Sequence, residues 1–499
     1  MRAARQWFLH GIPAFVVCGM LLAYIQFASP DLVDVDGYYH IKTATLIRDH
    51  GLPLHFPWLK FTFLDEAGYT DHHLLQHLLQ IPFTYLGDLR LAAKWSAVGF
   101  ATFAFVMFTF ICWRYGIRYP LLWVVVLFAS SPAFLLRMSM PRGQSLSLGL
   151  QLIAFHFLLQ RRSVALAIVA AIFVWTYNGF LVLLPLTLCG VLVHWVVARR
   201  VAYPLFIGAV SGIIAGLVVH PYFPRDVFFL WNHIAPKLLT NNYAASVGTE
   251  WYPYSSWLLL LNAPLALMAY VGALVLTNRD EWLKDAPRLF WFFVSTLYLI
   301  LLLKSRRFVE YFPPSAVLFL AFTVRGWLGG ITVARVLHEK LHLAAASASS
   351  AVLLVALHYS ITNVREEIAR SPATSTYQGG AEWLAAHTPK GSTIFHTDWD
   401  DFPMLFYFNT HNTYLVGLDP DFMRLKNPKL FRSWEMISRG TVGAPEDLIL
   451  SEFGCEYVFT DNLHSDFLAI ADHSPRMQKV YEDVDVTIYR VLANQNARQ

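Results

Sequence analysis

The chain has 499 residues, of which 56% are hydrophobic and only 14% are charged. Soluble globular proteins carry about 25% charged residues, so the composition excludes an ordinary soluble protein and indicates a chain that crosses a membrane several times. The net charge of +4 is too small to indicate a nucleic-acid partner. The four cysteines show neither a disulfide pattern nor zinc-ligand spacing.

Apolar runs recur along the first 360 residues and predict a mainly α fold, a bundle of about eleven membrane-spanning helices, with a count of up to thirteen left open. The runs lie at residues 9–28, 93–113, 119–136, 145–160, 163–177, 180–197, 202–219, 255–277, 289–303, 313–329 and 343–360. The first run has no convincing small-residue cleavage site, so we interpret it as an anchor and not as a signal peptide.

Basic residues near the ends of the runs predict the orientation, because cytoplasmic loops are enriched in Lys and Arg. Arg2 and Arg5 place the N-terminus in the cytoplasm, and the basic loops that follow alternate to the same side. The outer face then receives loops 29–92, 137–144, 220–254 and 304–312 and everything after about residue 361. The chain is therefore predicted to be an integral protein of the inner or plasma membrane.

The residues after 360 change character. Helix-like EEIAR and AEWLAAHTP segments are followed by strand-like runs STIFHTD, TYLVGL, CEYVFTD and VTIYRVL. Alternating helix and strand signals predict a small α/β domain. We expect two units, a membrane domain over residues 1–360 and an extracytoplasmic α/β domain over residues 361–499.

Two acidic residues, Asp34 and Asp36, follow the first apolar run in the string DVDGYYHIK. Carboxylates at the edge of a bilayer are costly unless a metal, a cationic ligand or a base offsets their charge. Such a pair can hold a hard divalent cation or act as a general base. The alternative is a solvated turn after a helix.

Some basic residues on the outer face break the charge rule: Arg137, Arg142, Arg225, Lys304, Arg306 and Arg307. Guanidinium groups at the end of an apolar run suit the phosphate or diphosphate of a lipid. The alternative is that they anchor the ends of spans or pair locally.

The string GYTDHHLLQHLL places His73 and His77 four residues apart, on one face of a predicted helix. Such a pair can bind a transition metal, but a polar helix edge packed at the membrane interface is the favoured interpretation. Asp71 and His72 in the same string suit hydrogen bonds to a ligand.

These motifs, in this order and on one face, resemble those of the catalytic subunit of oligosaccharyltransferases, and more broadly of the GT-C membrane glycosyltransferases. The first-loop acidic motif corresponds to Asp36-Gly37-Tyr38, a later Ser/Thr-x-x-Glu-like motif to SVGTE ending at Glu250, and the Arg-Phe pair to Arg307–Phe308. The string DWDDF around Trp399 is the nearest match to the motif of the exterior domain. The second outer loop departs from the family, since it reads RMSMPRGQSL with Arg142 and no acid.

The resemblance implies a role for each motif. Asp36 and Glu250 would be catalytic, and Arg307, Arg306 and Arg142 would bind the donor phosphate. Contacts to acceptor or substrate would come from Tyr38, His40, Asp71, His72, Trp399 and Asp400. A divalent cation, Mg²⁺ or Mn²⁺, held by Asp36, Glu250 and Asp34, stays open because the second outer loop lacks its acid.

The expected activity is transfer of a sugar or glycan from a polyprenyl phosphate or diphosphate to an acceptor on the extracytoplasmic face, with inversion by direct displacement. The acceptor is a protein, a lipid or a glycan, and transfer of a monosaccharide to lipid or surface polysaccharide stays open. Two other classes remain. A transporter or flippase for lipid-linked glycans needs polar residues deep in several spans, and a non-catalytic membrane scaffold needs no site. The expected partners are the donor, the bilayer and the acceptor.

Overall fold

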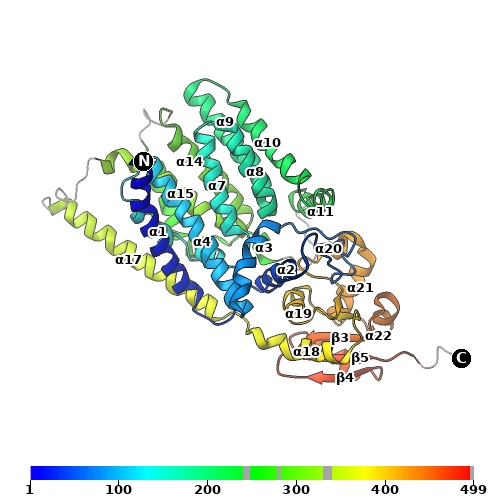
Figure 1. Cartoon of the computed structure of the whole chain (residues 1–499). Coiled ribbons are helices and arrows are strands. Elements are labelled where there is room, and N and C mark those ends of the chain that lie inside the picture. Colours follow the sequence, from blue (N-terminus) through cyan, green and yellow to red (C-terminus); the bar gives the residue numbers. More distant parts are fainter. Residues whose placement is uncertain (1, 240–247, 278–282, 330–339, 495–499) are drawn as a thin grey trace.

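The computed structural model describes residues 2–239, 248–277, 283–329 and 340–494. Apolar helices form a bundle at one end of the molecule, and a small sheet lies at the other end, beside the C-terminus (Figure 1). The bundle contains α1 (Arg2–Gln26), α4 (Leu89–Arg114), α5 (Pro120–Ser130), α6 (Pro132–Ser139), α7 (Gln144–Leu159), α8 (Ser163–Thr176), η2 (Asn178–Val182), α9 (Leu183–Ala198), α10 (Tyr203–Val218), α12 (Ser256–Asn262), α13 (Pro264–Leu276), α14 (Ala286–Lys304), α15 (Phe312–Gly329) and α17 (Lys340–Ala369).

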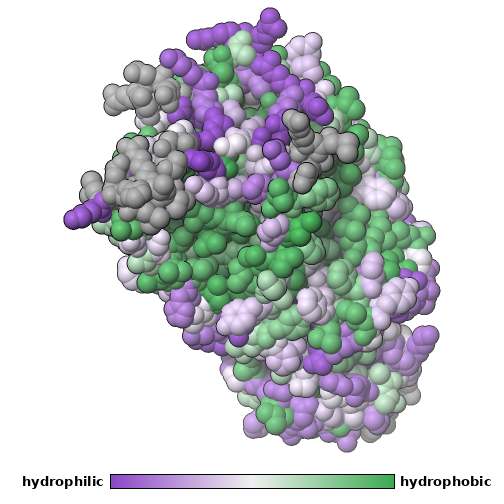
Figure 2. All heavy atoms as spheres, turned by 60° about the vertical axis from the view of Figure 1, so that its left-hand side comes forward, coloured by the Kyte–Doolittle hydropathy of each residue, from purple (hydrophilic) through white to green (hydrophobic). Residues whose placement is uncertain are grey.

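The outer surface of the bundle is apolar. Leu9, Val275 and Val355 are exposed to 70%, 78% and 70%. Figure 2 shows such side chains as a broad apolar belt between two more hydrophilic ends. Because soluble proteins rarely expose contiguous apolar surface of this extent, lipid is the solvent that suits the belt.

The predicted number of spans is not confirmed. Within the described ranges, five helices are long and apolar enough to cross a membrane, and two bent pairs, α5 with α6 and α12 with α13, bring the number to seven if each pair counts as one span. The bends measure 96° and 90°. The remaining predicted runs fall on four shorter apolar helices, α7, α8, α10 and α15. Each predicted run therefore coincides with a helix, but eleven crossings do not follow from length and composition.

Two contacts show how the bundle is held together. Gly208, Gly212 and Gly216 recur every fourth residue on α10, and a Cβ at Gly212 would lie 2.1 Å from the carbonyl oxygen of Ala167 on α8. Glycine at this spacing lets two helices pack backbone to backbone, as is common in membranes. At the end of α1, the Lys94 ammonium donates to the carbonyls of Gln26 (3.1 Å) and Ser29 (2.8 Å), which compensates carbonyls that lack helical partners.

The C-terminal α/β unit contains a five-stranded sheet in the order β2-β1-β3-β5-β4. Its strands are β1 (Thr393–His396), β2 (Thr413–Tyr414), β3 (Tyr457–Asp461), β4 (Met477–Glu482) and β5 (Val486–Val491). β1 is parallel to β2 and β3, whereas β5 is antiparallel to β3 and β4. Its helices are α18 (Gln378–His387), α19 (Phe402–Phe408), α20 (Asp421–Lys426), α21 (Pro428–Ser438), α22 (Pro445–Leu448) and α23 (Ser465–His473).

The four predicted strand runs all carry strands, and only β4 was missed. β4 is an edge strand whose Gln478 and Lys479 are exposed, so it lacks the apolar run that marks a buried strand. The predicted boundary at residue 360 lies inside α17, which continues to Ala369.

The first outer loop packs against the α/β unit and extends its sheet. This loop contains α2 (Asp36–His50), α3 (Leu74–Gln80) and η1 (Ile81–Leu86). The Tyr414 amide donates to the Trp58 carbonyl (2.8 Å), and the Lys60 amide donates to the Tyr414 carbonyl (3.1 Å). Phe56 of the loop and Phe402 of α19 belong to one buried apolar cluster. The loop and the domain are therefore built as one body around a shared core.

Candidate functional site

A cavity of about 480 Å³ lies between the outer loops and the α/β unit. Beside it lies a smaller cavity of about 80 Å³. Asp36, Arg142 and Glu250 line both cavities, and Arg307 lines the smaller one. Residues predicted from four separate loops are thus gathered at the end of the bundle that faces the α/β unit, and their roles stay predictions.

Asp34 and Asp36 share one partner, Arg142. The carboxylate of Asp36, at the first residue of α2, lies 2.5 Å from one terminal nitrogen of Arg142, and that of Asp34 lies 3.3 Å from the other. All three side chains are mostly buried, with exposures of 14% to 19%. The single positive charge of Arg142 is therefore shared between Asp34 and Asp36, of which Asp36 belongs to the motif that the resemblance identified.

Glu250 is held by two guanidinium groups. Its carboxylate lies 2.6 Å from Arg137 and 3.4 Å from Arg307. Arg137 is itself held by the fully buried Glu310, whose carboxylate it contacts through two nitrogens. Burial favours the protonated form of Glu250, but Arg137 and Arg307 outweigh it and lower the pKa of this carboxyl. Glu250 is therefore suited to orienting arginines and poorly suited to accepting a proton.

Arg307 is positioned by aromatic side chains. Its Nε donates to the hydroxyl of Tyr177 at 3.0 Å, and the guanidinium lies 4.9 Å from the ring centre of Trp251 and 5.3 Å from that of Tyr177. It stands in the short helix η5 (Arg306–Glu310), directly after α14. Stacking on aromatic faces fixes the planar group at the wall of the smaller cavity.

A buried chain of hydrogen bonds leads from Asp71 to the cavity. Asp71 Oδ2 lies 2.7 Å from His77 Nδ1, and His77 Nε2 lies 2.8 Å from His40 Nδ1. His40 lines the smaller cavity, whereas Asp71 and His77 lie behind it. The favoured prediction for His77, a packed polar helix edge, fits this arrangement. Asp71 thus reaches a ligand only through His40, whose orientation it helps to set.

Three of the predicted contact residues line neither cavity: Asp71, described above, Tyr38 and Arg306. Tyr38 is buried and its hydroxyl lies 2.5 Å from Thr374 Oγ1, so it fastens the first outer loop to the C-terminal unit. Arg306 donates to the Pro253 carbonyl (3.2 Å) and stacks over Tyr254. Neighbouring residues on a 3₁₀ turn point in different directions, which separates Arg306 from Arg307.

The other predicted contacts do line a cavity. His72 lines the smaller one, where its ring stacks on Phe229 at 4.3 Å. Trp399 and Asp400 line the larger one from the α/β unit, at the short helix η7 (Trp399–Asp401). The Glu250 motif is described only from residue 248 onward, so Ser246 lies outside the described residues.

The three carboxylates predicted as metal ligands do not fit a metal site. Arg142 lies between Asp34 and Asp36, and Glu250 is paired with two other arginines. Over the described parts of the chain, no group of three or more His, Cys, Asp or Glu is arranged to hold a metal ion. A guanidinium group occupies the position that a divalent cation would need next to these acids.

Burial raises the pKa of three carboxyl groups that line the larger cavity, those of Asp34, Asp36 and Asp400. Burial raises the pKa of Asp34 to about 6, against the opposing effect of Arg142. Burial also raises the pKa of Asp36, again opposed by Arg142. Loss of solvent at the cavity wall, with repulsion from Asp36 and Asp398, raises the pKa of Asp400 to about 7. Of the acids around Arg142 and Glu250, Asp36 combines contact with both cavities and a raised pKa, as a general base requires.

Sequence reasoning missed several residues that complete the site. Tyr177 and Glu310 hold the arginines, and Asp419, in the loop before α20, lines both cavities near His233 at 3.8 Å. The Arg137–Glu310 pair had one signal in the sequence, since both charges border apolar runs. Asp419 had none beyond the turn string LDPD.

Comparison with solved structures finds this arrangement of helices and exterior domain elsewhere. The archaeal oligosaccharyltransferase AglB from Archaeoglobus fulgidus, solved with an inhibitory peptide and a dolichol-phosphate, matches with a TM-score of 0.66 at 12% identity, over 93% of this chain and 71% of AglB. ArnT from Cupriavidus metallidurans, bound to undecaprenyl phosphate, matches with a TM-score of 0.58 at 14% identity, over 97% of this chain and 98% of ArnT. The arabinofuranosyltransferase AftD from mycobacteria matches with a TM-score of 0.56 at 16% identity, over 96% of this chain and 40% of AftD.

No family profile and no curated protein sequence matches the chain. At 12% to 16% identity these structural matches establish the fold alone. The chain has the fold of the GT-C membrane glycosyltransferases.

Proposed function

We propose that the chain is an integral membrane glycosyltransferase that moves a sugar or glycan from a polyprenyl phosphate or diphosphate to an acceptor on the extracytoplasmic face. One observation carries the proposal: Asp36 and Arg307 line one cavity at the end of an apolar bundle with this fold. A base and a phosphate-binding group on the same cavity are what glycosyl transfer from a lipid phosphate needs. The N-terminus is cytoplasmic and the α/β unit extracytoplasmic in this proposal.

The donor enters with its tail along the apolar belt and its phosphate against Arg307. The 3.4 Å contact between Arg307 and Glu250 is longer than the 2.6 Å contact between Arg137 and Glu250. Phosphate binding therefore replaces the weaker contact, and Glu250 stays paired with Arg137.

The transfer itself is a single displacement. An acceptor hydroxyl or amide attacks the anomeric carbon, the bond from that carbon to the phosphate oxygen breaks, and the phosphate leaves with the electron pair. Asp36 takes the proton of the attacking group, and Arg307 stabilises the charge that develops on the leaving phosphate. Of the cavity acids, Glu250 is committed to arginines and Asp34 shares Arg142 with Asp36, so neither is placed as a second nucleophile.

The positive charge of Arg142 takes the role that a divalent cation plays beside paired aspartates. It fixes the orientation of Asp36 through a 2.5 Å contact and offsets the repulsion between the two carboxylates. No step of the proposed mechanism passes through a metal ion.

Within this class, transfer of a monosaccharide to a lipid or surface polysaccharide uses the same site with a smaller donor. The flippase and scaffold alternatives lack a comparable observation. The charged groups of the cavities belong to loops between the apolar runs and to the α/β unit, apart from Arg137 at the end of α6, whereas a flippase requires a polar path through the bundle.

The test is donor turnover by the purified full chain in lipid nanodiscs. A panel of polyprenyl phosphates and diphosphates carrying different sugars is offered with water or saccharides as acceptor, and release of the lipid phosphate is measured. We expect turnover of at least one donor, lost in Asp36→Asn. A wild-type chain that consumes no donor of the panel, or an Asp36→Asn variant with the wild-type rate, would refute the proposal.

A further inference from the structure

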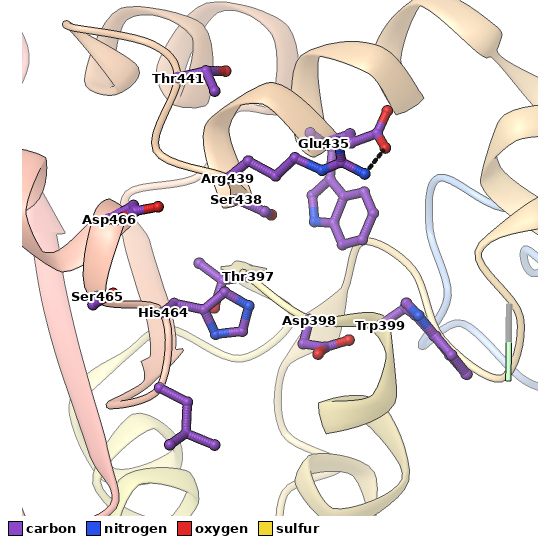
Figure 3. Close-up of a pocket in the computed structure, with 12 residues that line it drawn as sticks. Thr397, Asp398, Trp399, Glu435, Ser438, Arg439, Thr441, His464, Ser465 and Asp466 are labelled. Carbon is purple, nitrogen blue, oxygen red and sulfur yellow. Dashed lines mark ion pairs between the residues drawn. The ribbon is translucent and has the colours of Figure 1, made fainter. Parts of the chain in front are cut away.

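A second cavity, of about 500 Å³, lies within the α/β unit on the far side of Trp399 (Figure 3). Its volume is in the range of small-molecule binding sites. It adjoins the larger cavity of the candidate site, because Asp398 and Trp399 line both. We call it the domain pocket; it is lined by Thr397, Asp398, Trp399, Trp434, Glu435, Ser438, Arg439, Thr441, Leu463, His464, Ser465 and Asp466.

The domain pocket lies at the carboxyl ends of β1 and β3, where the strand order of the sheet reverses. Thr397 follows the end of β1 and Leu463 follows the end of β3, two parallel neighbours. From β1 the chain goes to β2 on one side, and from β2 it returns to β3 on the other side of β1. Where the strand order reverses in this way, the loops after the two strands separate and leave a crevice in which α/β proteins bind ligands.

The walls of the domain pocket are fixed in place. The Trp434 indole donates to the His396 carbonyl at 2.8 Å, which holds α21 over the end of β1. After α21 the chain turns at Gly440 with φ +63°, and a Cβ there would lie 2.5 Å from the carbonyl carbon of Asp466. Only glycine permits both the turn and the approach, which brings Thr441 and Asp466 to the same rim.

The lining is rich in hydroxyl and carboxylate groups, and its cations are already paired. Arg439 lies 2.7 Å from Glu435, and His464 lies 2.6 Å from Asp461. The pocket therefore disfavours anionic ligands such as lipid phosphates. Ser438 is only 8% exposed and its hydroxyl has no hydrogen-bond partner among the described residues. Figure 3 shows it between the two walls, and such a group needs a polar partner.

We propose that the domain pocket binds a neutral saccharide, as the part of a glycan acceptor that lies beyond the residue being modified. This inference rests on the proposed function. Trp399 offers an aromatic face for a sugar ring, and the surrounding carboxylates and hydroxyls pair with sugar hydroxyls. Peptides instead bind sheet edges or apolar grooves, neither of which the pocket provides. Because Asp398 and Trp399 border both cavities, an extended glycan passes from the pocket to Asp36.

The test combines a binding assay with a turnover assay on the full chain in nanodiscs. Binding is measured on an array of neutral, amino and acidic oligosaccharides together with peptides of similar length. The blocking variant is Thr441→Trp, at an exposed rim position, and its matched control is Gln478→Trp, at an exposed position of β4. Transfer of the sugar from the donor to water is measured as well; it needs no glycan acceptor, so its rate reports on the catalytic cavity alone.

We expect neutral oligosaccharides to bind wild type, Gln478→Trp and Asp36→Asn, and to bind Thr441→Trp at least about tenfold more weakly, a loss of about 1.4 kcal/mol. The rate at which the sugar is transferred from the donor to water stays unchanged in Thr441→Trp. Saccharide binding that Thr441→Trp leaves intact, binding of peptides in place of saccharides, or no binding at all overturns the inference, even where transfer to water continues. Absence of any donor turnover refutes the proposed function separately, because the array does not depend on it.

Discussion

Exchanging one carboxylate for an amide at Asp36, and separately at Asp34, tests the proposed base with a control that keeps the same partner. Both side chains contact Arg142 and are similarly buried, with exposures of 17% and 14%. Asp36 lines both cavities, whereas Asp34 lines only the larger one. A positioned general base contributes about 10²–10⁴ in rate, or about 2.7–5.4 kcal/mol of transition-state stabilisation. We expect Asp36→Asn to lose that factor in kcat and Asp34→Asn to lose less than about tenfold.

The thermal stability of each variant shows whether a lost rate comes from lost chemistry or from unfolded protein. Breaking a fully buried ion pair costs about 3–5 kcal/mol, but in each variant Arg142 keeps the other aspartate. Both variants should therefore melt within a few degrees of wild type, as measured by thermal unfolding in nanodiscs. The assay is release of polyprenyl phosphate at saturating donor. Equal losses of rate in the two variants, or a loss in Asp36→Asn matched by a loss of folded protein, would refute the assignment of Asp36 as base.

Three further predictions follow from the arginines and from pH. EDTA should leave the wild-type rate unchanged, because the guanidinium of Arg142 takes the place of a cation. For the same reason Arg142→Ala should lower the rate at least about tenfold. A wild-type rate that EDTA lowers and Mn²⁺ restores would contradict this. Arg307→Lys should raise the donor KM by about tenfold or more, since lysine lacks the planar fork, whereas Arg306→Lys should stay within about twofold; equal effects in donor titrations would show that the two are not separated as described. Because burial raises the pKa of Asp36, kcat/KM should fall as the pH is lowered, and should do so at a higher pH than for an ordinary aspartate, since the base becomes protonated. A rate that rises as the pH is lowered from neutral would exclude a carboxylate base.

The elements of the fold were largely predictable because their signals are local. Apolar length located every helix of the bundle, and alternating patterns located β1, β2, β3 and β5. Edge strand β4 and the short helices α20 and α22 escaped, since they bury too little apolar surface to leave a pattern, and α21 was missed although it buries Phe431, Trp434 and Ile437. Whether α5 and α6 form one bent span depends on packing, which hydropathy does not record.

Candidate site residues were predictable from the sequence where one charged residue at one position was enough to single them out. Asp36 and Arg307 were proposed because charges beside a membrane demand a reason, and Glu250 was proposed from the family resemblance. Pairing was not predictable: only the folded chain shows that Arg142 contacts Asp34 and Asp36, that Arg137 lies between Glu250 and Glu310, and that Tyr38 faces Thr374. These are contacts between residues up to 336 positions apart, and no local pattern encodes them.

The backbone hydrogen bonds that join Trp58 and Lys60 to Tyr414 impose an order on biogenesis. In the proposed orientation, the loop that carries Asp36 reaches the extracytoplasmic side early in synthesis, and the strand that completes it is translocated more than three hundred residues later. Until then the loop exposes unpaired backbone groups and aromatic side chains such as Phe56, which chaperones and proteases recognise. Truncation between α17 and β2 would therefore leave the first loop without its strand partner, so the amino-terminal half depends on the segment around Tyr414 to escape degradation.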